Sequence, residues 1–227
     1  MPRIAIPPRP RLAVFLSGSG TTLRNLLARQ AAGTLAGEVV CVASDRDGVA
    51  GLERAANAGV PATVVRRKQH ADRESFGAAL IGWAEAHGAD LVCLAGFLQL
   101  LAVPDRWENR VVNIHPSLLP SFGGKGCHGA HVHQAVLDAG CKVSGCTVHL
   151  ATNEYDRGPI LVQKAVPVLP DDTASTSRTT PPTSIPAGCK PMCAPRKSAF
   201  SPTPPTRAGS STFPSSASAP RATRAPR

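Results

Sequence analysis

Short apolar runs alternate with longer amphipathic runs between Arg11 and Val168. Apolar runs of about four to eight residues are typical of buried strands, and apolar positions every three or four residues are typical of helices. The pattern predicts strands over Arg11–Leu16, Glu38–Ala43, Ala62–Val65, Asp90–Leu94, Val111–Ile114, Lys142–Leu150 and Pro159–Val168. It predicts helices over Thr22–Ala32, Asp47–Ala58, Asp72–His87 and His131–Ala139.

Residue types at the helix ends refine these boundaries. Asp47 can cap the N-terminus of its helix, and Gly140 follows the last helix where a left-handed glycine is common. The apolar face of the third helix consists of Phe76, Leu80, Trp83 and Ala84.

Strand and helix signals that alternate along a chain predict an α/β fold with a mostly parallel, doubly wound sheet. In such sheets the ligand binds beyond the carboxyl ends of the strands. Four segments fall at these ends: Ser17–Thr22, Ala95–Leu101, His115–His128 and Thr152–Gly158. We therefore expect the functional residues to lie in these segments.

The composition changes abruptly after Asp172. Residues 173–227 contain 11 prolines and 19 serines or threonines, without any acidic residue, so they cannot bury enough apolar surface to offset the entropy of ordering. The pattern therefore predicts an N-terminal extension over residues 1–10, a folded domain over 11–172 and a disordered tail over 173–227.

The net charge of +10 at first suggests a nucleic-acid partner. However, residues 1–172 hold 17 Lys and Arg against 15 acidic residues, whereas residues 173–227 hold 8 Lys and Arg and no acid. The excess charge belongs to the tail, which lacks interleaved aromatics and a recognisable binding module. No specific nucleic-acid partner is expected.

Other protein classes are disfavoured by simple counts. No run approaches the ~20 apolar residues of a membrane span, so no membrane association is expected. Residues 1–10 contain four prolines and no apolar core of a secretion signal. The seven cysteines lack a disulfide spacing, which predicts reduced thiols in the cytoplasm.

The segment Ser17-Gly18-Ser19-Gly20-Thr21-Thr22 joins a predicted strand to a predicted helix. Small residues let backbone N–H groups surround an oxyanion, and the helix N-terminus adds partial positive charge. The segment is neither a Walker A loop nor a complete dinucleotide fingerprint. A tight turn with a helix cap is the alternative interpretation.

Asn113 and His115 end a strand and are followed by Pro116. Side chains two residues apart on a strand share a face, so an amide and an imidazole are brought together. Such a pair can hold an oxyanion and move a proton. A structural histidine at a strand end is the alternative.

Asp156 lies in the polar turn Asn153–Gly158 between the last two strands. A carboxylate beside His115 would raise the pKa of its imidazole, although aspartate is also common in hairpin turns. The nearby Cys127, His128, His131 and His133 match no structural zinc spacing, so no metal is expected.

Together these motifs resemble one family, the phosphoribosylglycinamide formyltransferases. The resemblance covers about residues 11–172, and Asn113-Ile114-His115-Pro116-Ser117-Leu118-Leu119-Pro120 is its most specific part. Further support comes from Ser17–Thr22, Ala95-Gly96-Phe97, Gly145–His149 and Asp156–Ile160. The resemblance implies a Rossmann-like formyltransferase domain that moves a formyl group from 10-formyltetrahydrofolate to glycinamide ribonucleotide in de novo purine synthesis, without a metal.

The resemblance also implies roles for single residues. Gly20, Thr21 and Thr22 would hold the ribonucleotide phosphate. The folate would contact Arg73, Leu98, Gln99, Leu100, Leu101, Asn113 and the loop around Asn153–Asp156. Asn113 and His115 would stabilise the tetrahedral oxyanion, Asp156 would keep His115 protonated, and a bound water would relay the amine proton.

The chain departs from the family in two places. The segment Ser121–His128 is unusually rich in glycine, which leaves the contacts of that loop open. After Ala174 nothing resembles the long amphipathic helix with which the family continues. A shift of reading frame near codons 174–178 would explain the change. It would leave an apolar patch that favours aggregation or a homodimer.

Other related and unrelated functions fit the sequence less well. Methionyl-tRNA formyltransferase has a C-terminal tRNA-binding domain, which the tail does not resemble. Formyltetrahydrofolate deformylase has a regulatory domain before the catalytic one, whereas ten residues precede the first strand here. A nucleic-acid-binding protein would rely on the basic tail alone. An inactive, binding-only remnant of the enzyme is the remaining alternative, because of the altered C-terminus.

Overall fold

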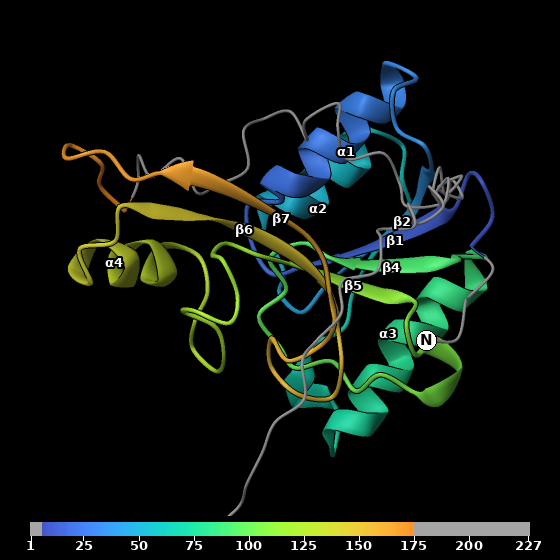
Figure 1. Ribbon diagram of the computed structural model, residues 1–227. Coiled ribbons are helices and arrows are strands. Elements are labelled where there is room, and N and C mark those ends of the chain that lie inside the picture. The colour runs from blue at the N-terminus through green and yellow to red at the C-terminus, as the bar shows by residue number, and fades with distance from the viewer. Residues whose placement is uncertain (1–5, 175–227) are drawn as a thin grey trace, which may run out of the picture. The chain divides into compact units, whose positions relative to one another are not determined.

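The computed structural model describes residues 6–174 (Figure 1), so the predicted N-terminal extension is covered only in part and the tail lies almost entirely outside this range. Seven strands form one sheet: β1 (Arg11–Leu16), β2 (Glu38–Ser44), β3 (Ala62–Val64), β4 (Leu91–Leu94), β5 (Val111–His115), β6 (Val143–Leu150) and β7 (Ile160–Pro167). The helices are α1 (Thr21–Ala31), α2 (Ala50–Asn57), α3 (Arg73–Ala86) and α4 (Ala130–Asp138). Two short 3-10 turns, Arg67–Gln69 and Asp105–Trp107, were not predicted. Within residues 6–174 no helix has the length and apolarity needed to cross a membrane.

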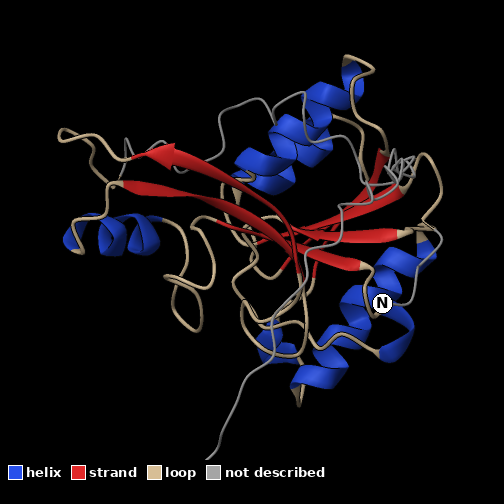
Figure 2. Ribbon diagram, in the orientation of Figure 1, coloured by secondary structure: helices blue, strands red, loops and turns tan. Residues whose placement is uncertain are grey.

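The strand order is β3-β2-β1-β4-β5-β6-β7. The five strands from β3 to β5 run parallel, and β6 and β7 add to the edge as antiparallel strands (Figure 2). The predicted α/β fold with a mostly parallel sheet is therefore confirmed, and the chain direction reverses between β5 and β6.

Both faces of the parallel strands are covered. Figure 1 shows α1 and α2 over one face and α3 over the other. Phe76, Leu80 and Ile81 of α3 are completely buried against Phe15 of β1, whereas Leu23 of α1 packs in a second cluster on the opposite face. Burying each large apolar side chain stabilises the fold by about 1.5–3 kcal/mol, so these two clusters hold the strand ends in place.

The helix ends show how local and tertiary contacts compete. Helix α3 begins as predicted, because Asp72 accepts a hydrogen bond from the Ser75 N–H at 2.7 Å in a capping box. The prediction for α2 was wrong at its start: the helix begins at Ala50, and Asp47 does not cap it. The Asp47 carboxylate instead binds the Arg66 guanidinium, and Gly48 has a left-handed φ of 61°, so the helix starts after it.

Strand β7 forms the outer edge of the sheet, and six of its first seven residues are exposed. The exposed large apolar side chains of the described chain gather on this hairpin: Val143, Ile160, Leu161 and Val162. Residues 175–227 follow this edge in the sequence but lie outside the described residues, so the predictions of a disordered or frameshifted tail stay predictions.

Candidate active site

A cavity of about 650 Å³ lies at the carboxyl ends of β1, β4 and β5. It is lined by residues 18–22, 94–101, 113–116, 124–129, 133, 149, 151–152 and 154–156. All four segments selected from the sequence contribute to this wall. The parallel strands and the β6–β7 turn therefore converge on one space.

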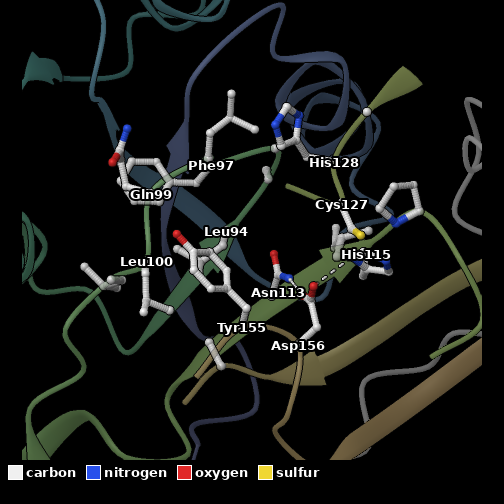
Figure 3. Close-up of a pocket in the computed structure, with 18 of the residues that line it drawn as sticks. Leu94, Phe97, Gln99, Leu100, Asn113, His115, Cys127, His128, Tyr155 and Asp156 are labelled. Carbon is white, nitrogen blue, oxygen red and sulfur yellow. Dashed lines mark hydrogen bonds and ion pairs between the residues drawn. The ribbon is translucent and has the colours of Figure 1, made fainter. Parts of the chain in front are cut away.

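Asp156 connects the two side chains of the Asn-x-His pair (Figure 3). Its Oδ2 atom lies 3.5 Å from Nδ1 of His115, and its Oδ1 atom accepts a hydrogen bond from the Asn113 amide nitrogen at 3.3 Å. The His115 side chain is 3% exposed and that of Asp156 is 9% exposed. The structure thus brings together the three residues that the sequence singled out.

A fourth polar residue, His149, belongs to the same cluster and was not predicted as a site residue. Its Nε2 atom lies 3.0 Å from the Asn113 amide nitrogen and 3.4 Å from Asp156 Oδ1. The antiparallel register pairs Asn113 directly with His149, which places both side chains on one face. Alternation along Lys142–Leu150 would have found His149 only if the pairing with β5 had been known.

The hydrogen-bond partners define the proton positions around His149. Its Nδ1 atom lies 2.9 Å from the Leu150 carbonyl oxygen, which can only accept, so Nδ1 carries a proton. Nε2 then accepts from the Asn113 amide. Both hydrogens of the Asn113 NH2 group are engaged, one by His149 and one by Asp156. In this arrangement the Asn113 side chain presents its carbonyl oxygen to the cavity.

His115 is held from both sides by acceptors. Its Nε2–H donates to the Phe122 carbonyl at 2.9 Å, and Nδ1 faces Asp156. Burial nevertheless lowers the pKa of His115 below its ordinary value, although the Asp156 carboxylate and the Phe122 carbonyl act in the opposite direction. Asp156 was expected to keep His115 protonated. The direction of its influence agrees, but desolvation outweighs it in the protein without substrate.

Asp156 itself is well prepared to stay ionised. Burial raises the pKa of Asp156, but its contact with His149 and the hydrogen bond from the Gly124 N–H, together with the attraction of both histidines, lower it overall. The Gly124 bond measures 2.8 Å. Asp156 has a φ of 53°, an uncommon backbone conformation for a residue with a side chain. The turn therefore bends sharply to aim this carboxylate at the cluster.

The Gly18–Thr22 loop occupies another part of the wall. Gly20 caps α1 with a φ of 66°, and a Cβ atom there would lie 2.6 Å from Gly51 Cα of α2. Gly20 is therefore required for the packing of α1 against α2, whatever it binds. The first backbone N–H groups of α1 lack partners within the helix and carry its partial positive charge. This loop can accommodate an anion.

The segment Leu98–Leu101 forms a third part of the wall. It is tied to the Gly18–Thr22 loop, because the Leu98 N–H donates to Ser17 Oγ at 2.9 Å. Gln99 also lines the cavity, but its amide nitrogen donates to Asp45 at 2.9 Å. Leu101 is buried in the α3 core, so this segment is anchored at both ends.

The loop that carries Asp156 is fastened to the opposite side of the cavity. The Asn153 side chain accepts from the Val103 N–H at 3.0 Å and donates to the Val103 carbonyl at 3.3 Å. Arg73 does not line the cavity; its guanidinium donates to the Asn153 carbonyl and pairs with Glu74. Arg73 thus lies beside the predicted folate site, at the back of this loop.

The histidine-rich stretch shows no metal-binding geometry among residues 6–174, where no three His, Cys, Asp or Glu side chains are grouped as ligands. Cys127, His128 and His133 instead line the cavity, and the His128 and His131 rings pack edge to face.

Comparisons with known proteins agree with this architecture. The chain matches the family described as Formyl transferase over residues 10–180. It is 44% identical over 168 residues to the trifunctional purine biosynthetic protein adenosine-3 of Gallus gallus, covering 73% of this chain and 16% of the relative. It is 39% identical to the chloroplastic phosphoribosylglycinamide formyltransferase of Arabidopsis thaliana, covering 74% of this chain and 58% of the relative. The chain thus spans only part of these relatives.

Solved structures give the same result. Glycinamide ribonucleotide transformylase 1 from Symbiobacterium toebii superposes with a TM-score of 0.68 at 44% identity, over 74% of this chain and 78% of the other. Phosphoribosylglycinamide formyltransferase from Brucella melitensis gives a TM-score of 0.66 at 43% identity, over 74% and 85% of the two chains. By family match, sequence identity and fold, the chain belongs to the phosphoribosylglycinamide formyltransferase family.

Proposed function

We propose that this chain transfers the formyl group of 10-formyltetrahydrofolate to the amine of glycinamide ribonucleotide, a step of de novo purine synthesis. The observation that carries the proposal is the buried cluster of Asn113, His115, His149 and Asp156 in the cavity of a chain from this family. The cytoplasmic location stays a prediction.

The cavity offers separate places for the two substrates. The Gly18–Thr22 loop suits the ribonucleotide phosphate, with Gly20, Thr21 and Thr22 at the N-terminus of α1. The apolar Leu98, Leu100 and Leu101 and the loop that carries Tyr155 suit the flat ring system of the folate. In the close-up (Figure 3), Asn113 lies between Tyr155 and His115, and the formyl carbon and the amine are proposed to meet beside its side chain.

In the proposed reaction the amine nitrogen forms a bond to the formyl carbon, and the carbonyl oxygen becomes an oxyanion. The bond from that carbon to the folate N10 atom then breaks. One proton leaves the amine and one proton reaches N10, so the products are the formylated ribonucleotide and tetrahydrofolate. Asn113 and His115 are proposed to stabilise the oxyanion through hydrogen bonds.

The geometry sets a condition on this role. Before substrate binds, the Asn113 NH2 group donates to His149 and Asp156, and His115 Nε2 donates to Phe122. The oxyanion must therefore replace one of these acceptors. Hydrogen bonds at catalytic sites commonly rearrange when the substrate arrives. The Phe122 carbonyl belongs to the glycine-rich loop between β5 and α4.

Asp156 is proposed to compensate positive charge at His115. As negative charge develops on the oxyanion, a proton on His115 gains a second favourable interaction beside that with Asp156. The neutral histidine favoured by burial can first accept a proton, directly or through a water, and the protonated form can then donate toward the oxyanion or N10.

The direct test is an assay of the purified full-length chain with 10-formyltetrahydrofolate and glycinamide ribonucleotide. We expect tetrahydrofolate and the formylated ribonucleotide to appear in equal amounts. Binding of both substrates without any product would contradict the proposed transfer and identify a binding-only protein.

A further inference from the structure

The glycine-rich loop between β5 and α4 contains a charged residue to which the reaction described above gives no role. Lys125 lines the cavity, and it is the only Lys or Arg among the described residues that do so. Its side chain is exposed and forms no ion pair with any residue of the 6–174 range. The cavity lining therefore contains one exposed, unpaired lysine together with two acidic residues, Glu154 and Asp156.

The backbone holds Lys125 at a defined point of the wall. The Cys127 N–H donates to the Gly124 carbonyl at 3.0 Å, which closes a four-residue turn with Lys125 second and Gly126 third. Gly126 has a φ of 86°, the conformation that the third position of a type II turn requires. Gly124, the first residue, donates its N–H to Asp156. Lys125 thus occupies the tip of a turn anchored to the chemical centre.

The tip lies away from the residues assigned to the folate. In Figure 3, Leu100 and Tyr155 lie on one side of Asn113, and Cys127, the last residue of the turn, and His128 lie on the other. On the folate side, the Arg73 guanidinium lies outside the cavity, where it contacts the Asn153 carbonyl and Glu74. Because Lys125 shares its turn with Cys127, on the other side of Asn113, it is assigned to the second substrate.

The charge of that substrate favours a cation beside the phosphate. A phosphate monoester carries about −1.5 to −2 charges near neutral pH. The N-terminus of α1 supplies only about half a positive charge, and Glu154 and Asp156 make the cavity unfavourable for an anion. We propose that Lys125 swings from its turn to bind the phosphate of the ribonucleotide, opposite the Gly18–Thr22 loop. This inference rests on the proposed function.

If Lys125 binds the phosphate, its substitution should weaken binding only of a ligand that carries the phosphate. We expect Lys125→Ala to weaken binding of glycinamide ribonucleotide about tenfold or more, as for the loss of one charge-assisted contact. Binding of glycinamide riboside, which lacks the phosphate, should be weak and equal in both proteins. Lys125→Arg should restore most of the affinity for the ribonucleotide. Lys142→Ala, an exposed lysine outside the cavity, is the matched control.

Isothermal titration of the full-length proteins with ribonucleotide and riboside measures these constants without requiring turnover. A steady-state assay should show a raised KM for the ribonucleotide with an unchanged KM for 10-formyltetrahydrofolate. Equal affinity of Lys125→Ala and the unmodified chain for the ribonucleotide would overturn the inference, as would a change confined to the folate. If the unmodified chain binds the ribonucleotide but transfers no formyl group, only the proposed function fails. If it binds no ribonucleotide, both are wrong.

Discussion

The sheet consists of a parallel and an antiparallel region, and valine side chains are buried to different degrees in the two. In the parallel region, Val14 and Val92 are completely buried, because helices cover both faces. In the antiparallel pair, Val162 is 39% exposed at the edge of the sheet. The parallel region holds the buried apolar core, whereas β6 and β7 contribute no buried apolar side chain to it.

The site lies at the boundary between the two regions. Asn113 and His115 come from β5, the last parallel strand, and His149 and Asp156 come from β6 and the turn that follows it. The antiparallel pair thus places a histidine and a carboxylate against the end of a parallel strand.

The largest effect on kcat is expected at His115, at the end of the parallel strand β5. His115→Ala should lower kcat by about 10²-fold or more, the usual scale for a lost proton-transfer or oxyanion-stabilising group. Stopped assays with both substrates measure this, and circular dichroism checks that the fold persists. An unchanged kcat would remove His115 from the mechanism.

The partner from the antiparallel region should act mainly through charge. Asp156→Asn should lower kcat about tenfold or more while keeping the turn, because asparagine tolerates a positive φ as well as aspartate does. Since Asp156 raises the pKa of His115 against the effect of burial, its removal should lower that pKa further. NMR titration of the His115 ring measures the shift, and an unmoved or raised pKa would refute this charge coupling.

One substitution made in both regions tests the difference in burial directly. Val14→Ala should lower the free energy of unfolding by about 2 kcal/mol, from lost burial and a cavity that cannot collapse. Val162→Ala should change it by about 0.5 kcal/mol or less. Denaturant titrations of both variants provide the comparison. Equal losses would mean that β7 is covered in solution, either by another part of the chain or by a second copy.

The smallest effect on catalysis is expected at Asn153, whose side chain joins the loop after β6 to the backbone of Val103. Asn153→Ala removes both hydrogen bonds to the Val103 backbone and should raise the KM for 10-formyltetrahydrofolate severalfold, with little change in kcat. Asn57→Ala, on an exposed helix end far in sequence from the cavity lining, serves as control. If kcat fell while the KM stayed constant, Asn153 would not position the folate loop.

The local pattern of the sequence determined a large part of this protein. Alternating apolar runs located all seven strands, and the two-residue period of a strand correctly placed Asn113 and His115 on one face. Gly140 follows the C-cap of α4 and has a φ of 65°, as its residue type predicted. These features depend on backbone conformation and on neighbours within a few residues, so they can be derived from the sequence without knowing the fold.

Tertiary structure alone decided the rest. His149 joined the site because antiparallel pairing sets it opposite Asn113, and the Asp47 carboxylate binds Arg66, which is distant in sequence. The net pKa shift of His115 depends on how deeply the assembled chain buries the ring. The role of Gly20 in helix packing required the position of Gly51. Pairing register, burial and close approach arise between distant segments, and no local period of the sequence encodes them.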